Sequence, residues 1–140
     1  MANISLGRVL VGGLVAGVVV TIGEYLLSEK VLSTQMKEFF TSHGFKKPGA
    51  YFIPIAVALN FALGIVMLLL YALIRPRLGP GPKTAVVAAL IAWFAIYVYT
   101  LIINGMALAI PPNLVLVGIA WGLVEYVLAA IAGAWLYQEA

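Results

Sequence analysis

GGLVAGVVVTIGEYLL, from Gly12 to Leu27, decides the fold of this chain. It belongs to an apolar run from Leu6 to about Leu27, and a helix of that length crosses a bilayer, since a crossing takes about 20 residues at roughly 1.5 Å of rise each. Three further apolar runs follow, over residues 51–74, 84–110 and 114–137. The sequence therefore predicts one transmembrane domain over residues 1–140, an all-α bundle of four membrane-spanning helices.

The composition also indicates a membrane protein. Of the 140 residues, 64% are hydrophobic and 9% are charged, which leaves too few polar side chains to cover a water-soluble domain of this size. The net charge of +3 comes from basic residues spread over loops and ends, so we expect no nucleic-acid partner.

The sequence shows no pattern of a catalytic or cofactor site. It has no cysteine, and His43 is the only histidine, which argues against thiolate and multi-histidine metal sites. No nucleotide-binding glycine loop and no nucleophile with its base is visible. We therefore expect no metal, no cofactor and no enzymatic activity.

Polar or proline-rich segments separate the four runs. Residues 28–48 form the only sizeable polar segment, and the spacing of their apolar side chains predicts a short amphipathic helix at the membrane surface. Residues 75–83, RPRLGPGPK, hold three prolines and two glycines, which predicts a tight turn that no helix enters. Pro111 and Pro112 end the third run, and Asn113 is the expected N-cap of the fourth helix.

Two glutamates lie inside the apolar runs, Glu24 in the first and Glu125 in the fourth. An ionisable side chain in hydrocarbon costs at least a few kcal/mol unless it is paired, hydrated or protonated, so both are functional candidates. Glu125 lies roughly 16 Å into its run, near the midplane, at a depth similar to that of Asn60 and Tyr97. These three residues are expected to form one polar cluster.

Glu24 lies nearer the end of its run, at the depth of Thr100 and Asn104 in the third run. These residues are expected to form a second cluster. The intramembrane polar candidates are Glu24, Asn60, Tyr97, Thr100, Asn104 and Glu125.

Small residues recur on the same helical faces as the two glutamates. In lipid, small residues at intervals of about four let helix backbones approach closely, and close packing drives helices together. The glycines expected at such packing faces are Gly13, Gly17, Gly64, Gly118, Gly122 and Gly133.

Glycine faces that each carry a glutamate able to hold packed helices together favour a non-enzymatic integral membrane protein. Such a protein acts as an oligomer or as an accessory subunit of a larger membrane complex. Its expected partners are the lipid bilayer and other copies or subunits. The alternative is a small transporter or channel that uses Glu125 and Glu24 for proton or cation coupling.

The expected location is the cell membrane, with several crossings. An even number of spans puts both termini and the turn at residues 75–83 on one side. The basic residues divide equally between the two sides, with Arg8, Arg75, Arg77 and Lys83 on the side of the termini and Lys30, Lys37, Lys46 and Lys47 on the other. Because the turn is short and close to two membrane ends, its charges favour cytoplasmic termini.

Two stretches resemble known proteins. RPRLGPGPKTA at residues 75–85 and GLVAGVVVTIGEYLL at residues 13–27 resemble a group of small bacterial four-helix integral membrane proteins of uncharacterised function. The resemblance covers most of the chain. It implies a four-helix membrane bundle and no particular activity, cofactor or site residue.

Overall fold

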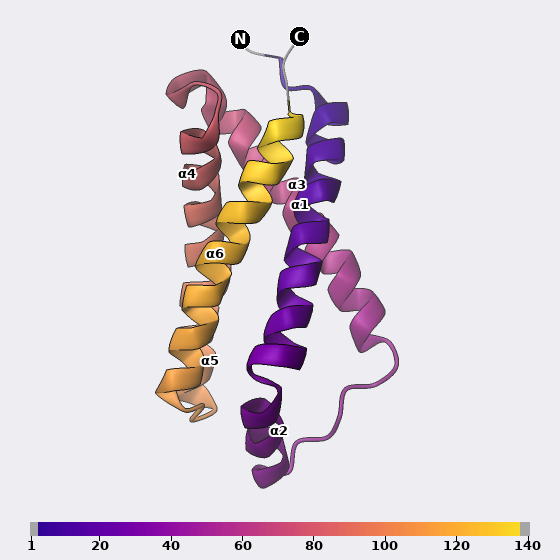
Figure 1. Cartoon of the computed structure of the whole chain (residues 1–140), viewed down its shortest axis with the longest axis vertical. Helices are drawn as coiled ribbons and strands as arrows, with labels where there is room; N and C mark the ends of the chain where they lie inside the picture. The colour runs from indigo at the N-terminus through magenta and orange to yellow at the C-terminus, as the bar shows by residue number, and fades with distance from the viewer. Residues whose placement is uncertain (1–2, 138–140) are drawn as a thin grey trace.

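The computed structural model describes residues 3–137, which are mostly helical and contain no strand (Figure 1). Four of its helices are long and apolar enough to cross a membrane: Leu6–Val31, Phe52–Leu78, Pro82–Ala107 and Pro112–Leu136. The prediction of an all-α bundle with four membrane-spanning helices is therefore confirmed.

Two of these helices contain a short π-helical segment. The successive elements are α1 (Leu6–Leu26), η1 (Leu27–Val31), α2 (Ser33–Ser42), α3 (Phe52–Leu78), α4 (Pro82–Trp93), η2 (Phe94–Val98), α5 (Tyr99–Ala107) and α6 (Pro112–Leu136). The first span is thus α1 with η1, and the third span is α4 with η2 and α5.

Helix α1 packs against both α3 and α6, and α4 packs against α6 and α3 (Figure 1). Side chains such as Leu68 and Ala129 are fully buried between these helices, whereas Leu59 and Val124 on the outer surface are 62% and 60% exposed. A continuous apolar outer surface of this kind is unusual for a protein in water and is covered by lipid in a membrane.

The contacts between the helices depend on glycine. A Cβ at Gly64 of α3 would lie 2.5 Å from the backbone nitrogen of Gly17 in α1, and a Cβ at Gly133 of α6 would lie 2.6 Å from the carbonyl oxygen of Gly12. All six glycines of the expected packing faces are buried, and each faces another helix of the same chain: Gly13, Gly17, Gly64, Gly118, Gly122 and Gly133.

The turn expected at residues 75–83 is shorter than predicted, because α3 continues to Leu78 with Pro76 inside it. That part of the prediction is wrong. A proline in the last turn removes only one intrahelical hydrogen bond, and the helix stops two residues later, so the cost stays local. Gly79 ends the helix with φ +84°, and its N–H donates to the carbonyl oxygen of Arg75 at 2.8 Å.

The predicted N-cap of the last helix is also wrong. Helix α6 begins at Pro112, Pro111 occupies the cap position, and no side chain caps the helix. A proline suits the first position because it has no N–H to leave unsatisfied and its φ is already helical. The preceding helix ends at Ala107, before the expected Ile110.

The polar segment at residues 28–48 contains the expected amphipathic helix, which is α2. Phe39 is its one buried residue, and the helix lies beyond the end of η1, at the end of the molecule opposite to the termini (Figure 1). Leu32 joins it to the bundle by packing with Leu27 and Leu114.

Gly79 supports a testable prediction about the α3–α4 turn. Its φ of +84° with ψ of 167° lies in a region that is open essentially to glycine alone, so Gly79→Ala is expected to destabilise the protein by about 1–3 kcal/mol. Thermal unfolding in detergent measures this loss. Gly49→Ala is the control, because Gly49 has open space around it and no positive φ. Equal midpoints for both variants would contradict the prediction.

Candidate functional site

Glu24, Tyr97 and Glu125 meet at one place inside the bundle, although they come from α1, η2 and α6. The phenol O–H of Tyr97 donates to Oε1 of Glu24, and the phenol oxygen lies 3.4 Å from Oε2 of Glu125. Glu125 is 4% exposed and Tyr97 is 8% exposed, whereas Glu24 is half-buried. We call these three residues the carboxyl–phenol cluster.

The two glutamates therefore belong to one cluster, not to the two clusters expected from counting residues. Helices α1 and α6 run in opposite directions (Figure 1). Since side chains on a helix lean toward its N-terminus, Glu24 leans toward the end with the termini and Glu125 leans toward the end with α2. The two side chains therefore converge. In addition, η1 extends the first span to Val31, so Glu24 lies deeper than predicted.

The position of Tyr97 depends on an irregular stretch of helix and on a glycine. Tyr97 lies in η2, and single-turn π segments within α-helices often occur at functional sites, where they change the direction of side chains. Its ring lies against Gly122, where a Cβ would be 2.6 Å from the ring atoms. The ring also packs edge-on against Tyr126, with centroids 5.1 Å apart. These contacts hold the phenol between the two carboxyl groups.

Sequence reasoning missed two residues that shape the cluster, Gly23 and Trp121. The carboxyl group of Glu125 fills the place that a side chain at position 23 would occupy. The indole N–H of Trp121 donates to the carbonyl oxygen of Gly23 at 3.0 Å and so ties α6 to α1. Their positions in the sequence could have identified them, because Gly23 directly precedes Glu24 and Trp121 lies one turn before Glu125.

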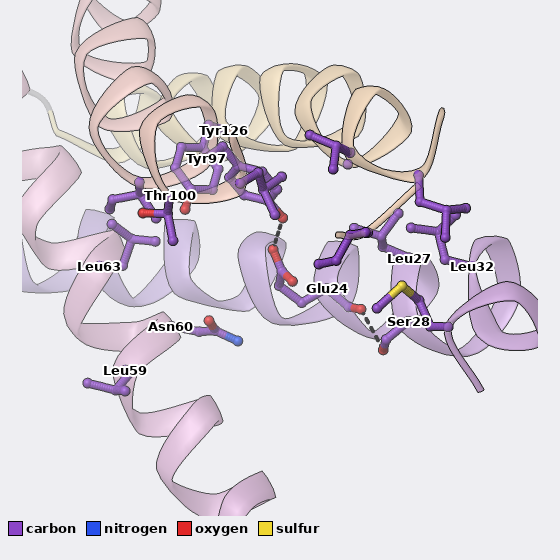
Figure 2. A pocket seen from close by; sticks show the side chains of 17 residues that line it. Glu24, Leu27, Ser28, Leu32, Leu59, Asn60, Leu63, Tyr97, Thr100 and Tyr126 are labelled. Atoms are coloured by element: carbon purple, nitrogen blue, oxygen red, sulfur yellow. Dashed lines mark hydrogen bonds between the residues drawn. The ribbon is translucent and has the colours of Figure 1, made fainter. Parts of the chain in front are cut away.

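A cavity of about 550 Å³ lies beside the cluster. Glu24, Asn60, Tyr97 and Thr100 are among the residues that line it, from α1, α3, η2 and α5 (Figure 2). Asn60 thus shares this cavity with Glu24, whereas Glu125 lies behind Tyr97 and does not line it. Asn104 is exposed and lies outside the cavity, so it is not part of the site.

The cluster contains two acids and no base. Glu24, Tyr97 and Trp121 lie near Glu125, and none of them is cationic. No lysine, arginine or histidine within residues 3–137 lines the cavity. Oε1 of Glu125 is buried without a hydrogen-bond partner in the described part of the chain.

Hydrogen counting sets a further condition. A phenol has one hydrogen to donate, so Tyr97 satisfies one carboxylate oxygen at a time. If Tyr97 donates to Glu24, a hydrogen bond between Tyr97 and Glu125 needs a second proton, held by the carboxyl group of Glu125. The arrangement therefore suits groups that share and pass on protons.

The described residues contain no group of three or more histidine, cysteine, aspartate or glutamate side chains that could hold a metal ion. The chemistry of the site is accordingly that of two carboxyl groups, one phenol and the neutral polar groups of the cavity. Such groups can exchange protons and can bind a positive charge.

No protein-family model matches this chain, and neither a curated protein nor a solved structure gives a match. The fold consists of four helices that are long and apolar enough to cross a membrane, which is consistent with an integral membrane protein, and the carboxyl–phenol cluster places two acids inside the helical bundle.

Proposed function

We propose that this protein is a small, non-enzymatic transporter of the cell membrane, in which Glu24 and Glu125 exchange protons or contact a cation. The observation that carries the proposal is the position of Tyr97, which links a glutamate on a cavity wall to a buried glutamate. A proton or cation arriving in the cavity meets Glu24 first, and a proton can then be exchanged with Glu125 through the hydroxyl of Tyr97.

The need for positive charge supports this function. Two ionised carboxyl groups inside the hydrocarbon region repel each other and lose their hydration, so the pair is costly unless protons or a cation neutralise it. Neither Tyr97 nor Trp121, which lie near Glu125 together with Glu24, supplies a positive charge. If the pair served only for packing, the fold would be more stable with one glutamate and one glutamine, because an amide needs no neutralising charge.

The packing around the cluster favours a transporter over an open channel. Toward α2 the cavity continues past Leu32 and Met36. Toward the termini, one turn from each glutamate, Val20 and Ala129 are buried, and Leu68 is fully buried beside them. The cluster is thus closed toward the termini in this conformation, and transport requires a second conformation that opens that side.

An oligomeric or accessory subunit is the function that the sequence by itself favoured. The glycine faces that suggested it are in contact within the chain, for example Gly64 with α1 and Gly133 with α1 and α3. Assembly through those faces therefore draws no support from the structure, and the transport proposal takes precedence.

The orientation belongs to the same proposal. The two ends of the described chain lie together, since the N–H of Ser5 is 3.4 Å from the phenol oxygen of Tyr137. The short turn between α3 and α4 lies at this end of the molecule, with Arg75 and Arg77 in the last turn of α3 and Lys83 in the first turn of α4. Basic residues in short loops favour the cytoplasmic side, so we place the termini in the cytoplasm and the cavity at the opposite half of the membrane.

Proton flux into liposomes tests the proposed function. The purified protein is reconstituted in vesicles that contain a pH-sensitive dye, and a potassium gradient with valinomycin supplies the driving force. We expect flux above that of protein-free vesicles. Tyr97→Phe, which removes only the hydroxyl group, should lower it about tenfold or more, because the link between the two carboxyl groups is lost.

Tyr99→Phe is the matched control, since Tyr99 is 62% exposed and two residues away in the same span. It should keep the wild-type flux. Wild-type flux no higher than that of empty vesicles would contradict the proposal, as would equal flux for Tyr97→Phe and the wild type.

A further inference from the structure

From the cavity beside Glu24 we infer the substrate class of the proposed transporter: a lipophilic molecule that carries one protonated amine. The inference rests on the proposed function and names what the cavity would hold. It starts from the size of the cavity, about 550 Å³, which falls within the range of about 300–1,000 Å³ that is usual for small-molecule sites.

The walls of the cavity select an apolar body. Most of the lining side chains are aliphatic, with Leu59 and Leu63 on one side of Glu24 and Leu27 and Leu32 on the other (Figure 2). Each CH₂ group of a ligand that enters such walls from water contributes about 0.8 kcal/mol, so an alkyl or aryl body fits and a strongly hydrated molecule does not.

Glu24 selects the charge of the ligand. It is the only acidic or basic residue among those that line the cavity in the described part of the chain. An anionic ligand would be repelled, and a neutral ligand would leave the carboxylate without a counter-ion. A cationic group next to Glu24 removes both penalties.

The neutral polar groups favour an ammonium over other cations. An ammonium has up to three hydrogens to donate. Asn60 and Thr100 present an amide oxygen and a hydroxyl to the same cavity as Glu24, so three kinds of acceptor are available (Figure 2). An inorganic ion would need several oxygen ligands in place of these aliphatic walls.

The location of the cavity fits a ligand dissolved in the membrane. The first half of α3 lies apart from α5 and α6 (Figure 1). It carries Leu59 and Asn60, and both residues line the cavity. Leu59 is 62% exposed on the surface that lipid covers. An alkylamine anchored in the bilayer can therefore reach Glu24 without first entering water.

Equilibrium binding tests the inference without any flux measurement. The protein is placed in phosphatidylcholine nanodiscs and titrated with radiolabelled dodecylamine, and binding to empty nanodiscs is subtracted. We expect saturable binding. Unlabelled dodecanol and dodecanoate, which have the same chain length without the positive charge, should compete at least about tenfold less well than dodecylamine.

Two pairs of variants locate the site. Glu24→Gln should weaken dodecylamine binding at least about tenfold, whereas Glu29→Gln, which removes the same charge from an exposed position five residues away, should not. Thr100→Phe fills the cavity and should also weaken binding, whereas Ile102→Phe on the outer surface should not. The Thr100 pair of variants locates the binding site even if Glu24→Gln fails to fold.

Unchanged dodecylamine binding in a folded Glu24→Gln or Thr100→Phe protein would overturn the inference, and so would dodecanol binding as tightly as dodecylamine. Dodecylamine binding no greater than that of empty nanodiscs, as expected if phosphatidylcholine itself occupies the cavity, would overturn it as well. The two proposals fail in different ways. Saturable amine binding without proton flux would contradict the transport proposal and would leave the amine-binding site supported.

Discussion

Gly64→Leu is expected to prevent the bundle from folding. A Cβ at Gly64 would already contact the carbonyl oxygen of Gly13 and would lie 2.5 Å from the nitrogen and 2.9 Å from the Cα of Gly17. These are backbone atoms of α1, so no side-chain rotation relieves the overlap. Helices α1 and α3 would have to separate along their whole contact, at a cost of more than about 3 kcal/mol.

Size-exclusion chromatography and thermal unfolding in detergent measure this effect. We expect Gly64→Leu to elute as aggregate or to unfold far below the wild type. Gly7→Leu is the control, because Gly7 lies in α1 with open space around it. A Gly64→Leu protein with the wild-type midpoint would show that α1 and α3 do not pack as described.

Glu125→Gln is expected to abolish proton flux and to leave the fold intact. Glutamine has nearly the same shape as glutamate and keeps a hydrogen-bonding oxygen for Tyr97, so the packing of α6 against α1 should survive. An amide cannot take up and release a proton at neutral pH, so any relay through Glu125 stops. Flux should fall to that of protein-free vesicles.

The same variant separates transport from a purely structural role. If Glu125 serves only to lock the helices together, Glu125→Gln keeps both assembly and flux. Gly122→Leu acts in the opposite way, since a side chain there displaces the ring of Tyr97 and damages packing whatever the role of Glu125. A stable Glu125→Gln protein with wild-type flux would contradict the transport proposal and favour the accessory-subunit function.

Much of the fold was predictable because the bilayer constrains it strongly. Backbone polar groups in hydrocarbon must pair within the helix, so four apolar runs of sufficient length require four helices. The packing glycines were predictable for a similar reason, since small residues at intervals of four have few other uses in lipid. Pro76 shows the limit of such local reasoning, because a helix tolerates a proline in its last turn that it would not tolerate in its middle.

The two glutamates show what the sequence alone determined and what the tertiary structure decided. The sequence determined that Glu24 and Glu125 lie within apolar runs, on the glycine faces of their helices, because hydropathy and helical periodicity are local properties. Counted along the expected spans, however, they differ in depth by about 12 Å. Only the packing of antiparallel α1 and α6, with the two side chains leaning toward each other and Tyr97 between them, joins them in one cluster.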